Sequence, residues 1–232
     1  MTAVDILKQT RYKISASPLF ISLKMIRMIF CFLLILPFIS YANAAYMATF
    51  FTSDMKNLLK QTFFQDHEQS STFFNNKRAV YCDHSTIEFN PSANSLNNYQ
   101  LHYGHIQNLT VLAYAEDEHA QAILVHSIRN PSINQYPHVT ISVSNKSPYT
   151  AVYSNDLWKR LVDNGIIEVN LDEHDKPQLV LLKNQLNEWQ GKLSSVGKYE
   201  ETQAYVKIMD QSIQLHGIVC LSSLWTNEKC QK

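Results

Sequence analysis

Six short runs rich in β-branched and aromatic residues follow one another between Arg78 and Leu221, and they restrict what this chain can fold into. Such residues favour extended backbone, and the segments between the runs contain the Pro, Asn, Ser and acidic residues that are typical of turns. The runs are Arg78–Asn90, Leu109–Tyr114, Ala122–Ile128, His138–Ser144, Gln203–Ile208 and Ile213–Leu221. Strands should therefore make up most of the fold.

Two segments are expected to be helices. Apolar residues recur at helical spacing over Met55–Phe63, and Ser53 is a suitable N-cap for them. The segment Ser154–Val162 has a similar pattern and ends shortly before Gly165. Strands mixed with helices predict the α+β class.

No linker rich in Pro, Gly or Ser divides residues 45–232, and 45% of the chain is apolar, so we expect one domain with a substantial core. The Asn- and Ser-rich segment Pro91–Tyr103 is predicted to be a surface loop. The segment Gln178–Trp189 fits either a helix or a strand. Three large aromatic side chains are expected in the core: Phe89, Trp158 and Trp189.

The N-terminal segment has the three parts of a secretory signal peptide. Lys24 and Arg27 form the positively charged part, and Met28–Ile39 form the apolar part. Ala42-Asn43-Ala44 then fits a signal-peptidase site. The apolar stretch is shorter than the roughly twenty residues that span a bilayer. We therefore expect residues 1–44 to be an extension plus a signal peptide, and the protein to be exported, either to a periplasm or by secretion. An uncleaved membrane anchor is the alternative.

An oxidising compartment permits disulfides, and we expect Cys220 and Cys230 to form one. Cys82 lies in an apolar strand-like run and is expected to be a buried thiol. No Cys or His spacing resembles that of structural zinc, and no cofactor is expected. Lys plus Arg and Asp plus Glu number 20 each, which argues against a protein that coats long nucleic acid. None of the five glycines forms a dinucleotide-binding or P-loop motif.

The same short phrase occurs twice in strand-like runs: His84-Ser85-Thr86-Ile87 and His138-Val139-Thr140-Ile141. Residues i and i+2 of a strand lie on one face, so each phrase places an imidazole beside a hydroxyl. Two such strands side by side would place two imidazoles and two hydroxyls around one point. Six other histidines are expected to have no catalytic role: His102, His105, His119, His126, His174 and His216.

Two imidazoles and two hydroxyls suit phosphodiester hydrolysis. One imidazole can deprotonate water while the other protonates the departing oxygen, because histidine titrates in the required range. The hydroxyls of Thr86 and Thr140 can donate to the non-bridging oxygens, where negative charge accumulates in the transition state. This proton chemistry requires no metal.

The two phrases resemble the paired H-x-T-x motifs of the two-histidine (2H) phosphoesterase superfamily, and most closely those of the 2′,3′-cyclic-nucleotide 3′-phosphodiesterase catalytic domain. The resemblance extends loosely over about two-thirds of the chain. It implies a two-lobed α+β fold with pseudo-twofold symmetry, in which antiparallel sheets line a central cleft. It also implies a phosphodiesterase that opens 2′,3′-cyclic phosphates of nucleotides or RNA ends to 2′-phosphates. By motif position His138 would activate water, His84 would protonate the 3′ oxygen, and Thr86 and Thr140 would bind the phosphate.

The expected partner is thus a nucleotide or a short RNA that carries a cyclic phosphate. Pro148 and Tyr149 follow the second motif closely and are candidates for packing against a base. Two alternatives remain open: an exported protein that binds a nucleotide or cyclic dinucleotide without turnover, and a hydrolase of 2′-5′-linked oligonucleotides or of ADP-ribose cyclic phosphate. The oligomeric state is not indicated by the sequence.

Overall fold

The structure is a computed structural model that describes residues 45–65, 78–127, 129, 131–146, 148–171, 177–181, 187–209, 213–225 and 230. Residues 44–232 form one compact unit. The expected signal peptide and His174 lie outside the described residues. Within the described ranges, no helix is both long and apolar enough to cross a membrane.

Antiparallel strands dominate the fold, and six of those described close into a barrel. Around the barrel they are β1 (Tyr46–Phe51), β3 (His84–Phe89), β6 (His138–Ser144), β5 (Ala120–His126), β4 (Ile106–Asp117) and β11 (Gln214–Leu221), which pairs again with β1. The long strand β4 takes part twice: its first half pairs with β11 and its second half with β10 (Thr202–Ile208). Beyond β10 lies β9 (Glu188–Leu193), β2 (Arg78–Val80) pairs with β6, and β7 (Ile167–Leu171) and β8 (Pro177–Leu181) form a separate hairpin.

Side-chain alternation separates the inside of the barrel from its outside. Val139 and Ile141 of β6 pack inside with Phe51, Val111 and other apolar residues. Leu59 of α2 (Ser53–Leu59) and Phe63 of the following π-helical turn η1 (Lys60–Gln65) join this cluster. The N-cap of α2 is Thr52, one residue earlier than expected, and its side chain accepts a hydrogen bond from the Met55 amide.

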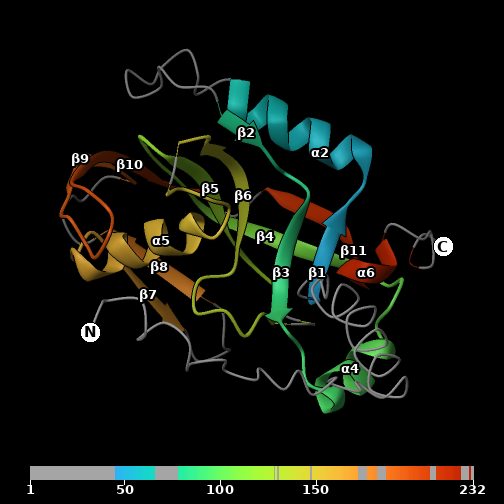
Figure 1. The fold of residues 1–232 in the computed structure, drawn as a ribbon. Helices are drawn as coiled ribbons and strands as arrows, with labels where there is room; N and C mark the ends of the chain where they lie inside the picture. Colours follow the sequence, from blue (N-terminus) through green and yellow to red (C-terminus); the bar gives the residue numbers. More distant parts are fainter. Residues whose placement is uncertain are drawn as a thin grey trace, which may run out of the picture. The chain divides into compact units, whose positions relative to one another are not determined.

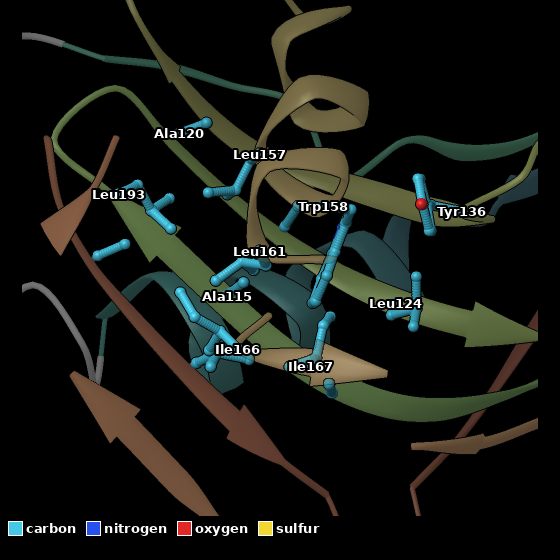
Figure 2. Close-up of a cluster of buried hydrophobic side chains, with 14 of the residues drawn as sticks. Ala115, Ala120, Leu124, Tyr136, Leu157, Trp158, Leu161, Ile166, Ile167 and Leu193 are labelled. Atoms are coloured by element: carbon cyan, nitrogen blue, oxygen red, sulfur yellow. The ribbon is translucent and has the colours of Figure 1, made fainter. Parts of the chain in front are cut away.

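The helix α5 (Tyr153–Asp163) packs on the outside of the barrel. Its residues Leu157, Trp158 and Leu161 point toward Ala115 of β4 and Leu124 of β5 (Figure 2). All three are fully buried, so the burial predicted for Trp158 is confirmed; Trp189 is buried as well. Gly165 follows the helix with φ +61°, as expected of a residue that ends it.

A buried arginine links α5 to the sheet through hydrogen bonds and an ion pair. The Arg160 guanidinium donates hydrogen bonds to the Tyr153 hydroxyl (2.6 Å) and to the backbone carbonyl of Ser194 (2.9 Å), and it lies 3.7 Å from the Asp117 carboxylate. Tyr153 in turn donates a hydrogen bond to Asp117. Because a buried charge needs partners, this network fixes α5 against the turn at the end of β4.

Two expectations about the segment from Phe89 to Tyr103 are wrong. The segment Pro91–Tyr103 contains a helix, α4 (Ala93–Gln100), which Ser92 caps by accepting a hydrogen bond from the Ser95 amide. Leu96 and Tyr99 pack against Ile87 and hold this helix at the opposite end of β3 from α2 (Figure 1). Phe89, expected in the core, is 57% exposed because β3 ends there.

The expected disulfide between Cys220 and Cys230 is present, beside the short helix α6 (Ser222–Trp225). Cys82 is a buried free thiol, as predicted, and burial raises its pKa to about 12. The segment predicted as one strand over Arg78–Asn90 is divided at Cys82, whose φ is +57°.

Candidate active site

The two H-x-T phrases lie side by side on neighbouring strands. Strands β3 and β6 pair antiparallel, with Ser85 opposite Val139 (Figure 1). In an antiparallel pair the flanking residues are then also opposed, so His84 faces Thr140 and Thr86 faces His138. The local twofold axis of the strand pair passes between the middle residues of the two phrases and exchanges one phrase with the other.

The four side chains share the outer face of the barrel. Val139 and Ser85 turn inward and are buried, whereas the four flanking side chains are half-buried. Opposed side chains on paired strands lie about 5 Å apart at their β-carbons, and diagonal neighbours such as His84 and His138 lie about 7–8 Å apart. Two imidazoles and two hydroxyls therefore lie around one small area, and each of the four residues is partly exposed to solvent.

The residues that pair with the two threonines on the next strands are small. On β5, Leu124 is opposite His138 and Ala122 is opposite Thr140. On β1, Phe50 is opposite His84 and Ala48 is opposite Thr86. Each threonine thus has an alanine opposite it on the strand that flanks the pair, which limits steric crowding where a phosphoryl group would bind.

His138 is held as a neutral ring. Its Nδ1 lies 2.8 Å from the backbone carbonyl oxygen of Tyr136, which can only accept a hydrogen bond, so Nδ1 carries the proton and Nε2 has a lone pair. Burial, with a smaller contribution from the nearby His84, lowers the pKa of His138 from its usual 6.5 to about 4, although the hydrogen bond to the carbonyl opposes this. At neutral pH this ring can accept a proton at Nε2.

His84 has a charged partner instead. Its Nδ1 lies 2.8 Å from Oδ1 of Asp83, and the His84 side chain is 24% exposed. Burial by itself would raise the pKa of Asp83, but the hydrogen bond and charge of His84, with the charge of Lys56, hold that pKa below its usual value. Asp83 is therefore ionised at neutral pH and accepts the Nδ1 proton of His84.

Two aromatic rings of β1 contact the His84 ring. The Tyr46 ring centre lies 4.9 Å from that of His84, and the Phe50 ring centre lies 5.6 Å from it. Tyr46 also stacks on Phe89, with 6.2 Å between ring centres. Tyr46 and Phe89 were not identified as site residues from the sequence, because their contact arises only when β1 pairs with β3. Asp83 was not identified either, because its contact with His84 requires the irregular backbone at Cys82.

Side chains of the loop before β6 form hydrogen bonds with the backbone of the first motif. The Ser132 hydroxyl donates to the carbonyl of Thr86 (2.8 Å), and the Asn134 amide group donates to the same carbonyl (3.3 Å). After β6, the hydroxyl of Thr140 makes a long 3.5 Å contact with the carbonyl of Ala151. The Thr86 and Thr140 side chains remain on the site face.

Tyr149, a candidate for packing against a base, is placed among other aromatic residues. Its ring stacks on His119 at 3.6 Å between centres and on Tyr199 at 5.7 Å. Pro148 beside it is exposed. Substrate contact by either residue remains a prediction.

The histidines expected to have no role are mostly placed away from the two motifs. His105 is exposed, and the exposed His216 ring makes a hydrogen-bond contact with Asn108. His119 is half-buried against Tyr149. Among the described residues, no group of three or more His, Cys, Asp or Glu side chains could hold a metal ion.

No family model matches the chain, and no curated protein matches its sequence significantly.

Proposed function

We propose that this protein is a phosphodiesterase of the 2H type, which opens 2′,3′-cyclic phosphates of nucleotides or RNA ends to 2′-phosphates. One observation carries the proposal: the pairing of Ser85 with Val139 sets two H-x-T phrases about a local twofold axis. The two-lobed 2H arrangement would follow if this axis also relates the elements on either side of β3 and β6. Such symmetry at a site built from two H-x-T phrases suits a ligand with a tetrahedral centre.

The chemistry divides between the two rings. His138 Nε2 takes a proton from water, and the water oxygen forms a bond to phosphorus. The bond from phosphorus to the 3′ oxygen breaks, and protonated His84 gives its Nε2 proton to that oxygen. The hydroxyls of Thr86 and Thr140 donate to the two non-bridging oxygens. The product is a 2′-phosphate with a free 3′ hydroxyl, and each ring ends with the proton count that the other had at the start.

The charges around the two rings support this division. The ionised Asp83 carboxylate accepts the Nδ1 proton of His84, as in a catalytic Asp–His pair. His138 has a neutral carbonyl as its hydrogen-bond partner and a pKa of about 4, so this ring is neutral at neutral pH. Its basicity in the free protein is low, and the negative charge of a bound phosphate would raise it.

A nucleobase would lie on the aromatic side of the site. Tyr46 connects His84 to the exposed ring of Phe89, and exposed aromatic rings stack on nucleobases without strong base preference. The proposed substrate is therefore a nucleotide or a short RNA end rather than a simple phosphodiester.

The test is turnover of the four 2′,3′-cyclic mononucleotides, with the position of the phosphate in the product identified. We expect 2′-phosphates, and we expect His84→Ala and His138→Ala each to remove nearly all turnover while the fold is kept. The matched control is His216→Ala, an exposed histidine on another strand, which should be fully active. Full activity of either motif variant would refute the proposal.

A nucleotide-binding protein without turnover is the second candidate, and the low pKa of His138 favours it, because a general base works best when its pKa is near the working pH. A rise in melting temperature with a cyclic nucleotide but no product would support binding alone. The same four side chains would also accept 2′-5′-linked oligonucleotides, which belong in the same screen.

Export through residues 1–44 remains part of the proposal. The Cys220–Cys230 disulfide supports it, because such bonds persist in oxidising compartments. Mass spectrometry of the natural N-terminus should find a chain that begins after Ala44, and a chain that retains Thr2 would contradict cleavage.

A further inference from the structure

Asp83 contacts its own neighbour in the chain, which regular strand geometry does not allow. Successive side chains of a strand point to opposite faces, yet Asp83 Oδ1 lies 2.8 Å from His84 Nδ1. The departure begins at Cys82, whose φ of +57° is a conformation that residues other than Gly, Asn and Asp seldom adopt. This backbone conformation lies directly before Asp83 and lets its side chain reach His84, the histidine of the first motif.

Hydrogen bonds fix the backbone on both sides of the irregularity. The Cys82 amide donates to the carbonyl of Thr140 (3.0 Å), and the Asp83 carbonyl accepts from the amide of Phe51 (2.9 Å). The segment is thus tied to β6 on one side and to β1 on the other. Strain that surrounding contacts maintain is typical of functional sites.

The contact determines which nitrogen of His84 faces outward. An ionised carboxylate can only accept, so the Nδ1 of His84 carries a proton. Nε2 is then the atom left for a ligand, and the ring is further held by Tyr46 and Phe50. His138 is oriented in the same sense by a neutral carbonyl. The two rings therefore present the same nitrogen but have partners of different charge.

We propose that Asp83 is a positioning residue that fixes the tautomer and orientation of His84 and, by its charge, gives this ring the acid role in the pair. The acid role of His84 rests on the proposed function, but the effect of Asp83 on the tautomer and orientation of the His84 ring rests on the contact itself. Asp83 touches no substrate atom in this account.

The experiment combines side-chain ¹⁵N NMR of the histidines at neutral pH with steady-state kinetics on a 2′,3′-cyclic mononucleotide. In the natural protein His84 Nδ1 should be protonated. In Asp83→Ala the Nε2–H tautomer should rise and kcat should fall about 10- to 100-fold, the size of effect seen when a metal-bound imidazole loses the partner that orients it, with KM changed far less. Asp83→Asn keeps an acceptor oxygen and should preserve the Nδ1–H form better than Asp83→Ala.

Asp54→Ala is the matched control, because Asp54 is an exposed aspartate on α2 and should leave both measurements unchanged. The Asp83 side chain is 39% exposed, so its variants should fold, and their melting temperatures verify this. A natural protein in which His84 is mainly the Nε2–H tautomer overturns the proposal, as does an Asp83→Ala variant with unchanged spectra and kcat. If the natural protein turns over no cyclic nucleotide, the proposed function fails, while the NMR comparison still decides whether Asp83 positions the ring.

Discussion

Acidification should destabilise this protein through His138, and the size of the effect can be worked out. The pKa of His138 is about 4 in the folded chain against the usual 6.5 that applies when it is unfolded. Between these values the unfolded chain binds a proton that the folded chain does not, so stability is complete above pH 6.5 and is lost as the pH falls toward 4. A tenfold change in proton affinity corresponds to about 1.4 kcal/mol, which gives about 3 kcal/mol in all. Partial solvent contact of the half-buried ring reduces this to about 2 kcal/mol.

The assay is urea unfolding at a series of pH values for the natural protein and for His138→Asn. Asparagine does not titrate, and its amide can donate to the Tyr136 carbonyl as His138 Nδ1 does. Other groups also lose stability in acid, so the quantity to compare is the difference between the two proteins. That difference should change by about 2 kcal/mol in favour of the variant between neutral pH and about pH 4. A difference that is independent of pH would refute a neutral, buried His138, and His216→Asn provides the exposed control.

Four further changes test the site and the fold. Thr86→Val and Thr140→Val should each lower kcat on a cyclic nucleotide about a hundredfold, because each removes one donor to the phosphoryl oxygens, and urea unfolding should show little loss of stability. Cys230→Ser opens a disulfide between residues separated by 10 positions, and urea unfolding should show a loss of about 2–3 kcal/mol; an equal stability of the two forms would contradict the bond. Arg160→Ala leaves Asp117 without its cation and should cost about 3–5 kcal/mol by the same measurement, whereas a loss below about 1 kcal/mol would show that α5 does not depend on this pair.

The strands of the barrel could be predicted where sequence alternation is regular. The segment His138–Ser144 was predicted with the bounds of β6, because Val139 and Ile141 pack inside the barrel and polar residues alternate with them. The runs Leu109–Tyr114 and Ala122–Ile128 correspond to β4 and β5, although β4 extends through Asp117, which is buried beside Arg160.

The helix α4 could not be predicted from propensity, because its Asn and Ser residues favour turns. Tertiary contacts override that preference: Leu96, Tyr99 and Tyr103 recur at helical spacing and pack against Ile87. That spacing, with Ser92 as a cap, was the signal available in the sequence.

The partners of the motif histidines depend on features that no local pattern encodes. The two H-x-T phrases are visible in the sequence, but their pairing through Ser85 and Val139 depends on long-range register. The contact between Asp83 and His84 requires the irregular backbone at Cys82, which nothing in the sequence around it indicates.

A crystal structure of the protein with a bound nucleoside 2′-monophosphate tests the central claim most directly. The phosphorus atom should lie on the outer face of β3 and β6, with its oxygens within hydrogen-bond distance of Nε2 of both His84 and His138 and of the hydroxyls of Thr86 and Thr140. A phosphate bound elsewhere at saturating ligand, or two imidazoles that do not contact the same phosphoryl group, would contradict it.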